Sequence, residues 1–328
     1  MSQTSFLVFT DLHADIMHDA VARMQRISTA ALEADVDFVV QLGDLMYPDR
    51  AFLERQDTGR KSIACMQKKK PWSMNRDDEK LSILQLLSGI GKPVYSVIGN
   101  HDLHVCDKTA ICRYWNMPAP YYAFCEKGFR FLVLDTNLIW DHGCTIDMAF
   151  GNHSGYDEEY LRYLSEDQRI WLDRELTGSD EPCIVLSHVS LADPVSGIHE
   201  REKVLSVLGR HRDRVRLVMH GHGHVDGLRY EAGIPFWDVN SASYHFTGTK
   251  YACTRYSEKL CAAYPKLSGT APYYDPLYAI VELLDDRIRI HGTHSVFVGP
   301  TPQELGMPET ENDYEPCAEI RDREILFG

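Results

Sequence analysis

Short apolar runs recur along the chain, and in five cases a polar or charged residue follows within two positions of the end of the run. Near-continuous apolar runs of four to six residues are typical of β-strands that are buried on both faces. The pattern therefore predicts five interior strands. These runs are residues 5–10 (SFLVFT), 38–42 (FVVQL), 94–98 (VYSVI), 183–187 (CIVLS) and 215–219 (VRLVM).

Helical periodicity separates several of these runs. Apolar residues recur at helical spacing within residues 21–32, 81–87 and 170–176. The last of these stretches follows Ser165, and Gln168 three residues later completes a capping-box pattern. Alternating strands and helices predict an α/β domain with at least one mainly parallel sheet.

Two further pairs of apolar runs predict β-hairpins, because turn residues separate the two runs of each pair. A doubly wound parallel sheet does not need such hairpins, whereas a sandwich of two mixed sheets would include them. The pairs are residues 121–125 with 129–134, and 277–284 with 287–291.

A polar cluster follows each of the five predicted strands. In open α/β sheets, ligands bind beyond the carboxyl ends of the strands. Imidazole nitrogens mixed with carboxylate and amide oxygens suit a pair of divalent metal ions. The sequence therefore predicts one dinuclear metal site. Its clusters are Asp11-Leu12-His13, Gly43-Asp44, Gly99-Asn100-His101-Asp102, His188 and His220-Gly221-His222-Gly223-His224.

Spacing within two clusters suggests how their side chains are directed. Asp11 and His13 are two positions apart on a segment expected to be extended, so both side chains should point to the same face. The same reasoning applies to His222 and His224. The glycines beside these histidines would let the backbone approach the ions without a Cβ in the way.

These blocks resemble the calcineurin-like metallophosphoesterase family. That family's pattern is Asp-x-His, Gly-Asp, Gly-Asn-His-Asp/Glu, a lone His and Gly-His-x-His, and the chain carries every block in this order between residues 11 and 224. The resemblance implies an α/β fold, a four-layer αββα sandwich of two mixed β-sheets flanked by helices. It also implies two divalent metal ions, with Mn, Fe, Zn and Co all compatible with mixed His, Asp and Asn ligands.

The resemblance also implies roles for the site residues. Asp44 is expected to bridge the two ions. A metal-bound water would attack phosphorus in line with the leaving group, and His101 would act as an acid or stabilise developing charge. Asp102 is expected at most to orient His101. The remaining expected ligands are Asp11, His13 and His224 on one ion, and Asn100, His188 and His222 on the other.

One position departs from the family pattern. The segment from Gly43 to Tyr47 resembles the Gly-Asp-x-x-Tyr block of purple acid phosphatases, in which the tyrosine binds ferric iron. Those enzymes lack the histidine of Asp-x-His, whereas this chain has His13. We therefore favour Tyr47 as a pocket-wall or core residue, and keep metal ligation as the alternative.

Three other histidines are candidates for supporting roles. His220 shares its side of the strand with the histidines that follow it, and packing or support of a ligand is favoured over ligation. His104 and His245 lie in predicted loops and are the first candidates for contacts with substrate. A role as ordinary polar loop residues is the alternative for both.

The domain prediction is one calcineurin-like domain over residues 1–300 and an acidic tail over residues 301–328. Insertions at residues 45–76, 140–164 and 241–276 are candidates to cap the site. The first holds a basic run, which forms either solvated surface or a flap for a charged substrate. The third is rich in tyrosine, which would either stack on a base or pack in the core.

Charge and cysteine content limit the partners and the compartment. The chain of 328 residues carries 34 Lys and Arg against 48 Asp and Glu, a net charge of −14. An acidic surface disfavours long nucleic acid as a partner, because Lys and Arg supply that affinity. Nine cysteines without a CxxC pair, together with no signal peptide and no membrane-length apolar run, predict a cytoplasmic protein without a membrane partner.

The favoured function is that of a phosphodiesterase or pyrophosphohydrolase on small, nucleotide-like phosphate esters. The preference for diesters rests on the tyrosine-rich insertion and on the resemblance to small-molecule diesterases. The alternative is a phosphomonoesterase, including a protein phosphatase, and a catalytically silent scaffold of the same fold ranks third. The sequence leaves the exact substrate, the metal and the oligomeric state open.

Overall fold

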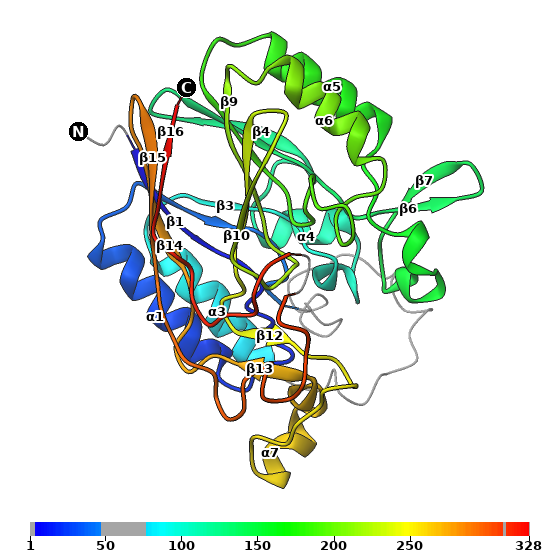
Figure 1. Cartoon of the computed structure of the whole chain (residues 1–328), viewed down its shortest axis with the longest axis vertical. Helices are drawn as coiled ribbons and strands as arrows, with labels where there is room; N and C mark the ends of the chain where they lie inside the picture. Colours follow the sequence, from blue (N-terminus) through cyan, green and yellow to red (C-terminus); the bar gives the residue numbers. More distant parts are fainter. Residues whose placement is uncertain (1–3, 47–76, 311–312, 328) are drawn as a thin grey trace.

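The protein is a sandwich of two six-stranded mixed β-sheets with helices on both outer faces (Figure 1). The computed structural model describes residues 4–46, 77–310 and 313–327. The four layers are those of the αββα sandwich that the resemblance implies, so the fold prediction is confirmed.

The first sheet combines strands from the two ends of the described chain. It consists of β1 (Thr4–Phe9), β2 (Phe38–Gln41), β3 (Val94–Ser96), β14 (Ala279–Leu283), β15 (Arg287–Gly292) and β16 (Arg323–Leu326). The strand order is β16-β15-β14-β1-β2-β3. β1, β2 and β3 are parallel, and the other three strands extend the sheet in antiparallel fashion from β1.

The second sheet is built from the middle of the chain. It consists of β4 (Tyr122–Glu126), β5 (Phe129–Val133), β8 (Cys183–Leu186), β9 (Val215–His220), β10 (Gly227–Glu231) and β11 (Ile234–Asp238). The strand order is β10-β11-β9-β8-β5-β4, with β4 and β10 as antiparallel edges of a parallel centre.

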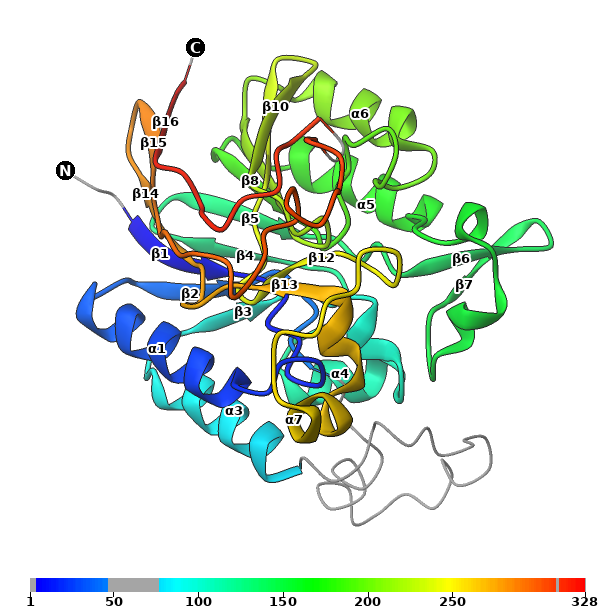
Figure 2. The same cartoon turned by 60° about the horizontal axis from the view of Figure 1, so that its bottom comes forward.

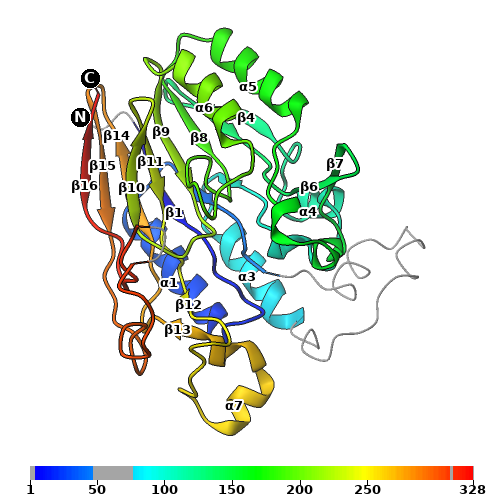
Figure 3. The ribbon, with the colours of Figure 1, turned by 45° about the vertical axis from the view of Figure 1, so that its right-hand side comes forward.

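One pair of long helices covers each sheet (Figure 3). On the first sheet, α1 (Ala20–Glu33) packs beside α3 (Asp77–Gly89). On the second, α5 (Glu166–Thr177) packs beside α6 (Arg201–Arg210), and Leu172 and Leu208 join the core formed with Val185. The predicted N-cap is confirmed, because Ser165 Oγ accepts a hydrogen bond from the backbone N–H of Gln168 at 3.2 Å. The Gln168 side chain does not complete a capping box, because it bonds to the backbone of Asp135.

Smaller elements lie around the sandwich. The hairpin of β6 (Leu138–Asp141) and β7 (Cys144–Asp147) projects from the body (Figure 2). The short helix α7 (Glu258–Ala263) projects at the bottom of the view in Figure 1. The other elements are β12 (Tyr244–Phe246), β13 (Thr270–Pro272), α4 (Lys108–Tyr114), η2 (His101–Leu103), η3 (Asn152–Gly155), η4 (Glu158–Tyr160) and η5 (Pro265–Gly269).

The predicted strands and both predicted hairpins are confirmed, with ends that differ by one or two residues. The end of the chain differs from the expected surface tail, because β16 pairs with β15 and adds a strand to the first sheet. Every helix in the described part of the chain falls short of the length and apolar content needed to cross a membrane.

An aromatic cluster joins the two sheets. Phe6 and Phe38 of the first sheet stack with their ring centroids 5.0 Å apart. Phe131 of the second sheet meets both of them edge-on, at 5.9 and 5.4 Å, and stacks on Phe124 at 4.6 Å. Phe6, Phe38 and Phe131 are fully buried. Phe124 also contacts the first sheet, with its ring centroid 3.5 Å from that of Tyr95. Phe131 and Phe124 therefore both join the sheets in this part of the core, and Phe131 is the more deeply buried of the two.

Replacing Phe131 by alanine should lower the free energy of unfolding by about 3–5 kcal/mol, because a large cavity would remain between the sheets. Chemical denaturation followed by circular dichroism measures this change. As a control, Ile170→Ala on the exposed face of α5 should change stability by less than about 0.5 kcal/mol. Equal effects of the two substitutions would contradict the central position of Phe131.

Candidate metal centre

The five polar clusters meet in the loops that follow β1, β2, β3, β8 and β9. Carboxylate and imidazole atoms from them form three overlapping groups, within each of which the candidate ligand atoms lie within 4.8 Å of one another. The structure thus brings residues from distant parts of the sequence to one place. The groups are Asp11, His13 and His224; His13, Asp44 and His101; and Asp44, His188 and His222.

The backbone at these residues is not extended as the spacing argument assumed. β1 ends at Phe9 and β9 ends at His220, before the candidate ligands begin. Asp11, His13, Asp44, His222 and His224 all have positive φ values, between 48° and 65°. Left-handed backbone is uncommon for residues other than glycine and is concentrated at functional sites. Asp11 and His13 still converge, through a turned loop and not through strand alternation, whereas His222 and His224 enter different groups.

Each candidate carboxylate uses one oxygen within the protein and directs the other at imidazoles. Asp11 Oδ2 accepts hydrogen bonds from Thr10 Oγ1 at 2.6 Å and from the backbone N–H of His222 at 3.0 Å. Asp11 Oδ1 is buried and has no hydrogen-bond partner among the described residues. It lies 3.5 Å from His13 Nε2 and 3.2 Å from His224 Nε2.

Asp44 has the same arrangement and lies between the outer groups. Its Oδ1 accepts a hydrogen bond from the backbone N–H of His101 at 2.8 Å. Its Oδ2 lies 3.3 Å from His188 Nε2 and 3.7 Å from His13 Nε2. His188 Nε2 is also 3.2 Å from Asn100 Oδ1. Asp44 is therefore the carboxylate that both outer groups approach.

Backbone carbonyls orient two of the histidines. Nδ1 of His188 lies 2.8 Å from the carbonyl oxygen of Leu42, and Nδ1 of His224 lies 2.8 Å from that of Tyr244. Because a carbonyl oxygen only accepts hydrogen bonds, these Nδ1 atoms carry the proton. Their Nε2 lone pairs then point into the cluster, which is the arrangement that metal-binding histidines adopt.

The residues present fit a pair of divalent cations. The partnerless Oδ1 of Asp11 lies among imidazole nitrogens, and His13 Nε2 faces His224 Nε2 at 3.1 Å. Mixed imidazole and carboxylate donors of this kind suit transition-metal ions. The three groups supply candidate ligands for two such ions.

The pKa values reflect the strong negative field of the two carboxylates. Burial alone would lower the pKa of His188, but the charge of Asp44 raises it to about 10. Burial would raise the pKa of Asp11, yet His224 and His13 hold it well below its ordinary value. Burial and the neighbouring His188 lower the pKa of His222 to about 3, which keeps this imidazole neutral and able to bind a cation.

Asp102 holds two site loops together, a role that the sequence reasoning missed. It is fully buried, and its oxygens accept hydrogen bonds from the backbone N–H groups of Asp44 (2.9 Å), Met46 (3.2 Å) and Gly99 (2.7 Å). The expectation that it only orients His101 is therefore replaced by a contact between the loops after β2 and β3. A carboxylate directly after the Gly-Asn-His block was the available signal.

Gly221 allows two site loops to approach closely. A Cβ at this position would lie 2.1 Å from Thr10 Oγ1 and 2.7 Å from Asp11 Oδ2. Any other residue would push apart the loops that carry Asp11 and His222. At Gly223 a Cβ would meet only an ordinary contact, 3.4 Å from Val225.

The other candidate residues lie at different distances from the cluster. His220 is buried, pairs with Asp238 through Nδ1 at 3.1 Å and stacks on Phe236, so packing explains it. His245 is fully buried and its Nδ1 lies 3.0 Å from the carbonyl oxygen of His224, which corrects its expected contact with substrate. Tyr47 lies outside the described residues.

A cavity of about 720 Å³ opens at the cluster. His104 lines it and stacks on His101 with ring centroids 5.2 Å apart. Sequence reasoning did not single out Arg162 and Lys266, which also line the cavity. These two cations come from residues 140–164 and 241–276, the expected insertions, of which further residues line the same cavity. The proposal that these insertions cap the site stays a prediction.

The fold and the donor set together define a class, the dinuclear metallohydrolases. The calcineurin-like phosphoesterase family matches residues 4–226, which is more than half of the chain. The chain therefore belongs to this family and is a metal-dependent phosphoesterase. A search of the curated proteins found no match.

The chain is similar to several solved structures, which share little sequence with it. A dimetal phosphatase from Danio rerio is 18% identical, with a TM-score of 0.62, over 91% of this chain and 99% of that one. The anchor in the inner membrane complex of Plasmodium is 13% identical, with a TM-score of 0.50, over 91% and 86%. A purple acid phosphatase from yellow lupin is 13% identical, with a TM-score of 0.48, over 93% of this chain and 55% of the phosphatase.

Asp102→Ala should destabilise the protein by about 3 kcal/mol or more, because three buried N–H groups would lose their acceptor. It should also reduce the metal bound per chain, measured by elemental analysis after dialysis. Asp107→Ala is the matched control, since Asp107 caps α4 by accepting from Ala110 and its loss should cost about 1 kcal/mol with metal content unchanged. Normal metal content in Asp102→Ala would contradict the role given to Asp102.

Proposed function

We propose that the protein is a dinuclear-metal phosphodiesterase or pyrophosphohydrolase that acts on small, nucleotide-like phosphate esters. The observation that carries the proposal is the convergence of three carboxylate and imidazole groups at a cavity of about 720 Å³. Sites that enclose small ligands have volumes of this order. The family membership supports the reaction class, and the cavity supports a small substrate.

The proposed ligand sets follow the two outer groups. Asp44 is the proposed bridge, supported by its position between His188 and His13. His104 remains a candidate contact for substrate, supported by its place in the cavity wall. The proposed ligands are Asp11, His13 and His224 for one ion, and Asn100, His188 and His222 for the other.

When bound, the two ions would neutralise charge on the phosphate ester and lower the pKa of a water molecule in the site. The protein's own groups would orient the ester. Lys266 brings positive charge to the cavity wall, which suits an anionic substrate. Arg162 also lines the cavity but donates to Glu158 Oε2 at 2.6 Å, and Glu158 lines the same cavity. Phe246 also lines the cavity and is 58% exposed, so its ring is available to stack on a base or an aromatic leaving group.

His101 is the proposed catalytic residue. It lines the cavity, and its ring centroid lies 4.9 Å from that of His13. Burial lowers the pKa of His101 well below its ordinary value. A neutral imidazole can donate a hydrogen bond but is a weak acid. We therefore favour a role in which His101 stabilises the leaving oxygen by a hydrogen bond over one in which it transfers a proton to it.

The alternatives keep the same fold. A phosphomonoesterase would use the same metal centre, and the substrate comparison below decides between the two. A silent scaffold is disfavoured because the chain carries every block of the family pattern, including His101.

The eight described cysteines are all free thiols, which supports the proposed cytoplasmic location.

The first test compares hydrolysis of bis(p-nitrophenyl) phosphate and p-nitrophenyl phosphate by the full chain, with and without Mn²⁺ after chelation. We expect turnover that depends on metal and a higher kcat/KM for the diester. A higher value for the monoester would favour the alternative. No turnover of either compound by a protein that holds two ions would contradict the proposed substrate class.

His101→Ala should lower kcat by about 10²-fold or more with little change in KM, because its interaction forms with the leaving group as charge develops. His101→Gln should retain more activity than the alanine variant, since glutamine keeps an N–H donor. His142→Ala is the control, because His142 is 97% exposed in the β6–β7 hairpin. Equal losses in the alanine and glutamine variants would favour the acid role instead.

A further inference from the structure

The C-terminal segment of the described chain, residues 313–327, lies behind the loops that carry the proposed metal ligands. It lies beyond residues 4–226, the part that matches the family, so the family pattern assigns it no role. Three sets of buried or half-buried contacts connect it to the site.

The first set fixes Asp226, which follows His224 by two residues and is 1% exposed. Arg323 binds it in bidentate fashion, with NH1 donating to Oδ1 at 2.8 Å and NH2 donating to Oδ2 at 2.7 Å. Trp237 Nε1 and the backbone N–H of Arg321 donate to the same carboxylate at 3.2 and 3.1 Å. Four donors satisfy both oxygens, so the end of the histidine loop is held in one position.

The second set begins at Tyr314. Its ring packs directly on Gly227, where a Cβ would lie 2.2 Å from Tyr314 Cζ. The side chain of Arg229 lies over this ring, with the guanidinium carbon 5.1 Å from the ring centroid. Arg229 Nε also donates to the Tyr314 hydroxyl at 3.0 Å. Tyr314 thereby holds the start of β10, directly after Asp226.

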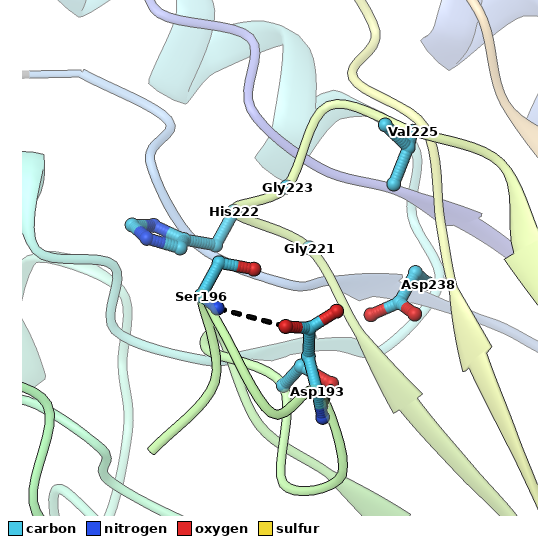
Figure 4. A pocket seen from close by; sticks show the side chains of 8 residues that line it. Asp193, Ser196, Gly221, His222, Gly223, Val225 and Asp238 are labelled. Carbon is cyan, nitrogen blue, oxygen red and sulfur yellow. Dashed lines mark hydrogen bonds between the residues drawn. The ribbon is translucent and has the colours of Figure 1, made fainter. Parts of the chain in front are cut away.

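Arg229 carries this contact on to the cavity wall. Its NH2 donates to Asp193 Oδ2 at 2.8 Å, and Asp193 Oδ1 accepts from the backbone N–H of Ser196 at 2.7 Å (Figure 4). Figure 4 shows Asp193 and Ser196 beside the loop of His222, around a small cavity that all three line. Ser196 and His222 also line the large cavity, so the contact reaches the proposed site.

The third set supports Asp11 from the same segment. Asn240 Nδ2 donates to the carbonyl oxygens of Cys317 at 2.9 Å and Glu319 at 3.1 Å. Asn240 Oδ1 accepts from the backbone N–H of Ser241 at 2.9 Å. Ser241 Oγ in turn donates to the carbonyl oxygen of Asp11 at 2.9 Å. The segment therefore supports both ligand loops of the first proposed ion.

We propose that residues 313–327 form a clamp that positions the metal-ligand loops, with the contact of Arg323 with Asp226 at its centre. None of the clamp residues is among the described residues that line the large cavity. They are positioning residues, which act through the geometry of Asp11, His222 and His224. The inference rests on the proposed metal centre and adds the part of the chain that keeps its geometry.

The test is Arg323→Ala in the full chain, with Mn²⁺ as the probe. Without Arg323 the buried Asp226 carboxylate loses its bidentate partner, and the histidine loop loses its fixed position. Mn²⁺ affinity, measured by competition with a chromophoric chelator, should fall about tenfold or more. Arg323→Lys keeps the charge but not the bidentate geometry, so its Mn²⁺ affinity should lie between that of the wild type and that of Arg323→Ala.

Arg130→Ala is the matched control. Arg130 is a half-buried arginine at the start of β5 that pairs with Glu175 of α5, so this variant removes an arginine–carboxylate contact that involves neither residues 313–327 nor the residues lining the large cavity. Its Mn²⁺ affinity should equal that of the wild type. Circular dichroism and thermal unfolding of the metal-free proteins check that each variant is folded.

Each outcome decides the inference. Wild-type affinity in folded Arg323→Ala, or an equal loss in Arg130→Ala, overturns the clamp while leaving the metal centre intact. A wild-type chain that binds no Mn²⁺ overturns the proposed metal centre and the clamp with it. If Arg323→Ala does not fold, Tyr314→Phe carries the test: removing only its hydroxyl should lower Mn²⁺ affinity about fivefold, and no change overturns the clamp.

Discussion

Two buried carboxylates held beside imidazoles are the interaction on which the rest of the site depends. Asp11 and Asp44 are almost fully shielded from water, and such charges are tolerated only when cations or hydrogen-bond donors compensate them. The protein gives each carboxylate donors for one oxygen and leaves the other directed at histidines. A folded chain with this charge distribution is therefore prepared to attract divalent cations.

The need to direct these carboxylates and imidazoles at one another also explains the left-handed backbone of the site loops. Bringing candidate metal ligands from separate strand ends to one place requires side-chain directions that extended loops do not provide. Left-handed conformations at Asp11, His13, Asp44, His222 and His224 supply those directions at a cost in local stability. The surrounding structure offsets that cost, for example through Asp102, Ser241 and the carbonyl groups that orient His188 and His224.

Much of the fold and the composition of the site could be predicted from the sequence, because buried parallel strands are continuous apolar runs and their polar ends stand out. The runs before Asp11 and His220 became strands, and the five clusters met. Side-chain contacts between distant segments were not predictable. His245 is in a buried strand behind His224, and Asp102 binds backbone groups of another loop. No local pattern distinguishes His245 from an ordinary loop residue, and the position of Asp102 after the Gly-Asn-His block does not identify its backbone partners.

The pairing of β1 with β14 has a consequence for how the molecule forms. Thr4 of the first strand lies opposite Leu283, so these partners are separated by most of the described chain. During synthesis β1 has to wait for β14 to leave the ribosome before its antiparallel edge is covered. Non-local pairing of this kind makes folding slow and leaves strand edges exposed meanwhile. The loop of Asp11, which follows β1, therefore acquires its final support only late in folding.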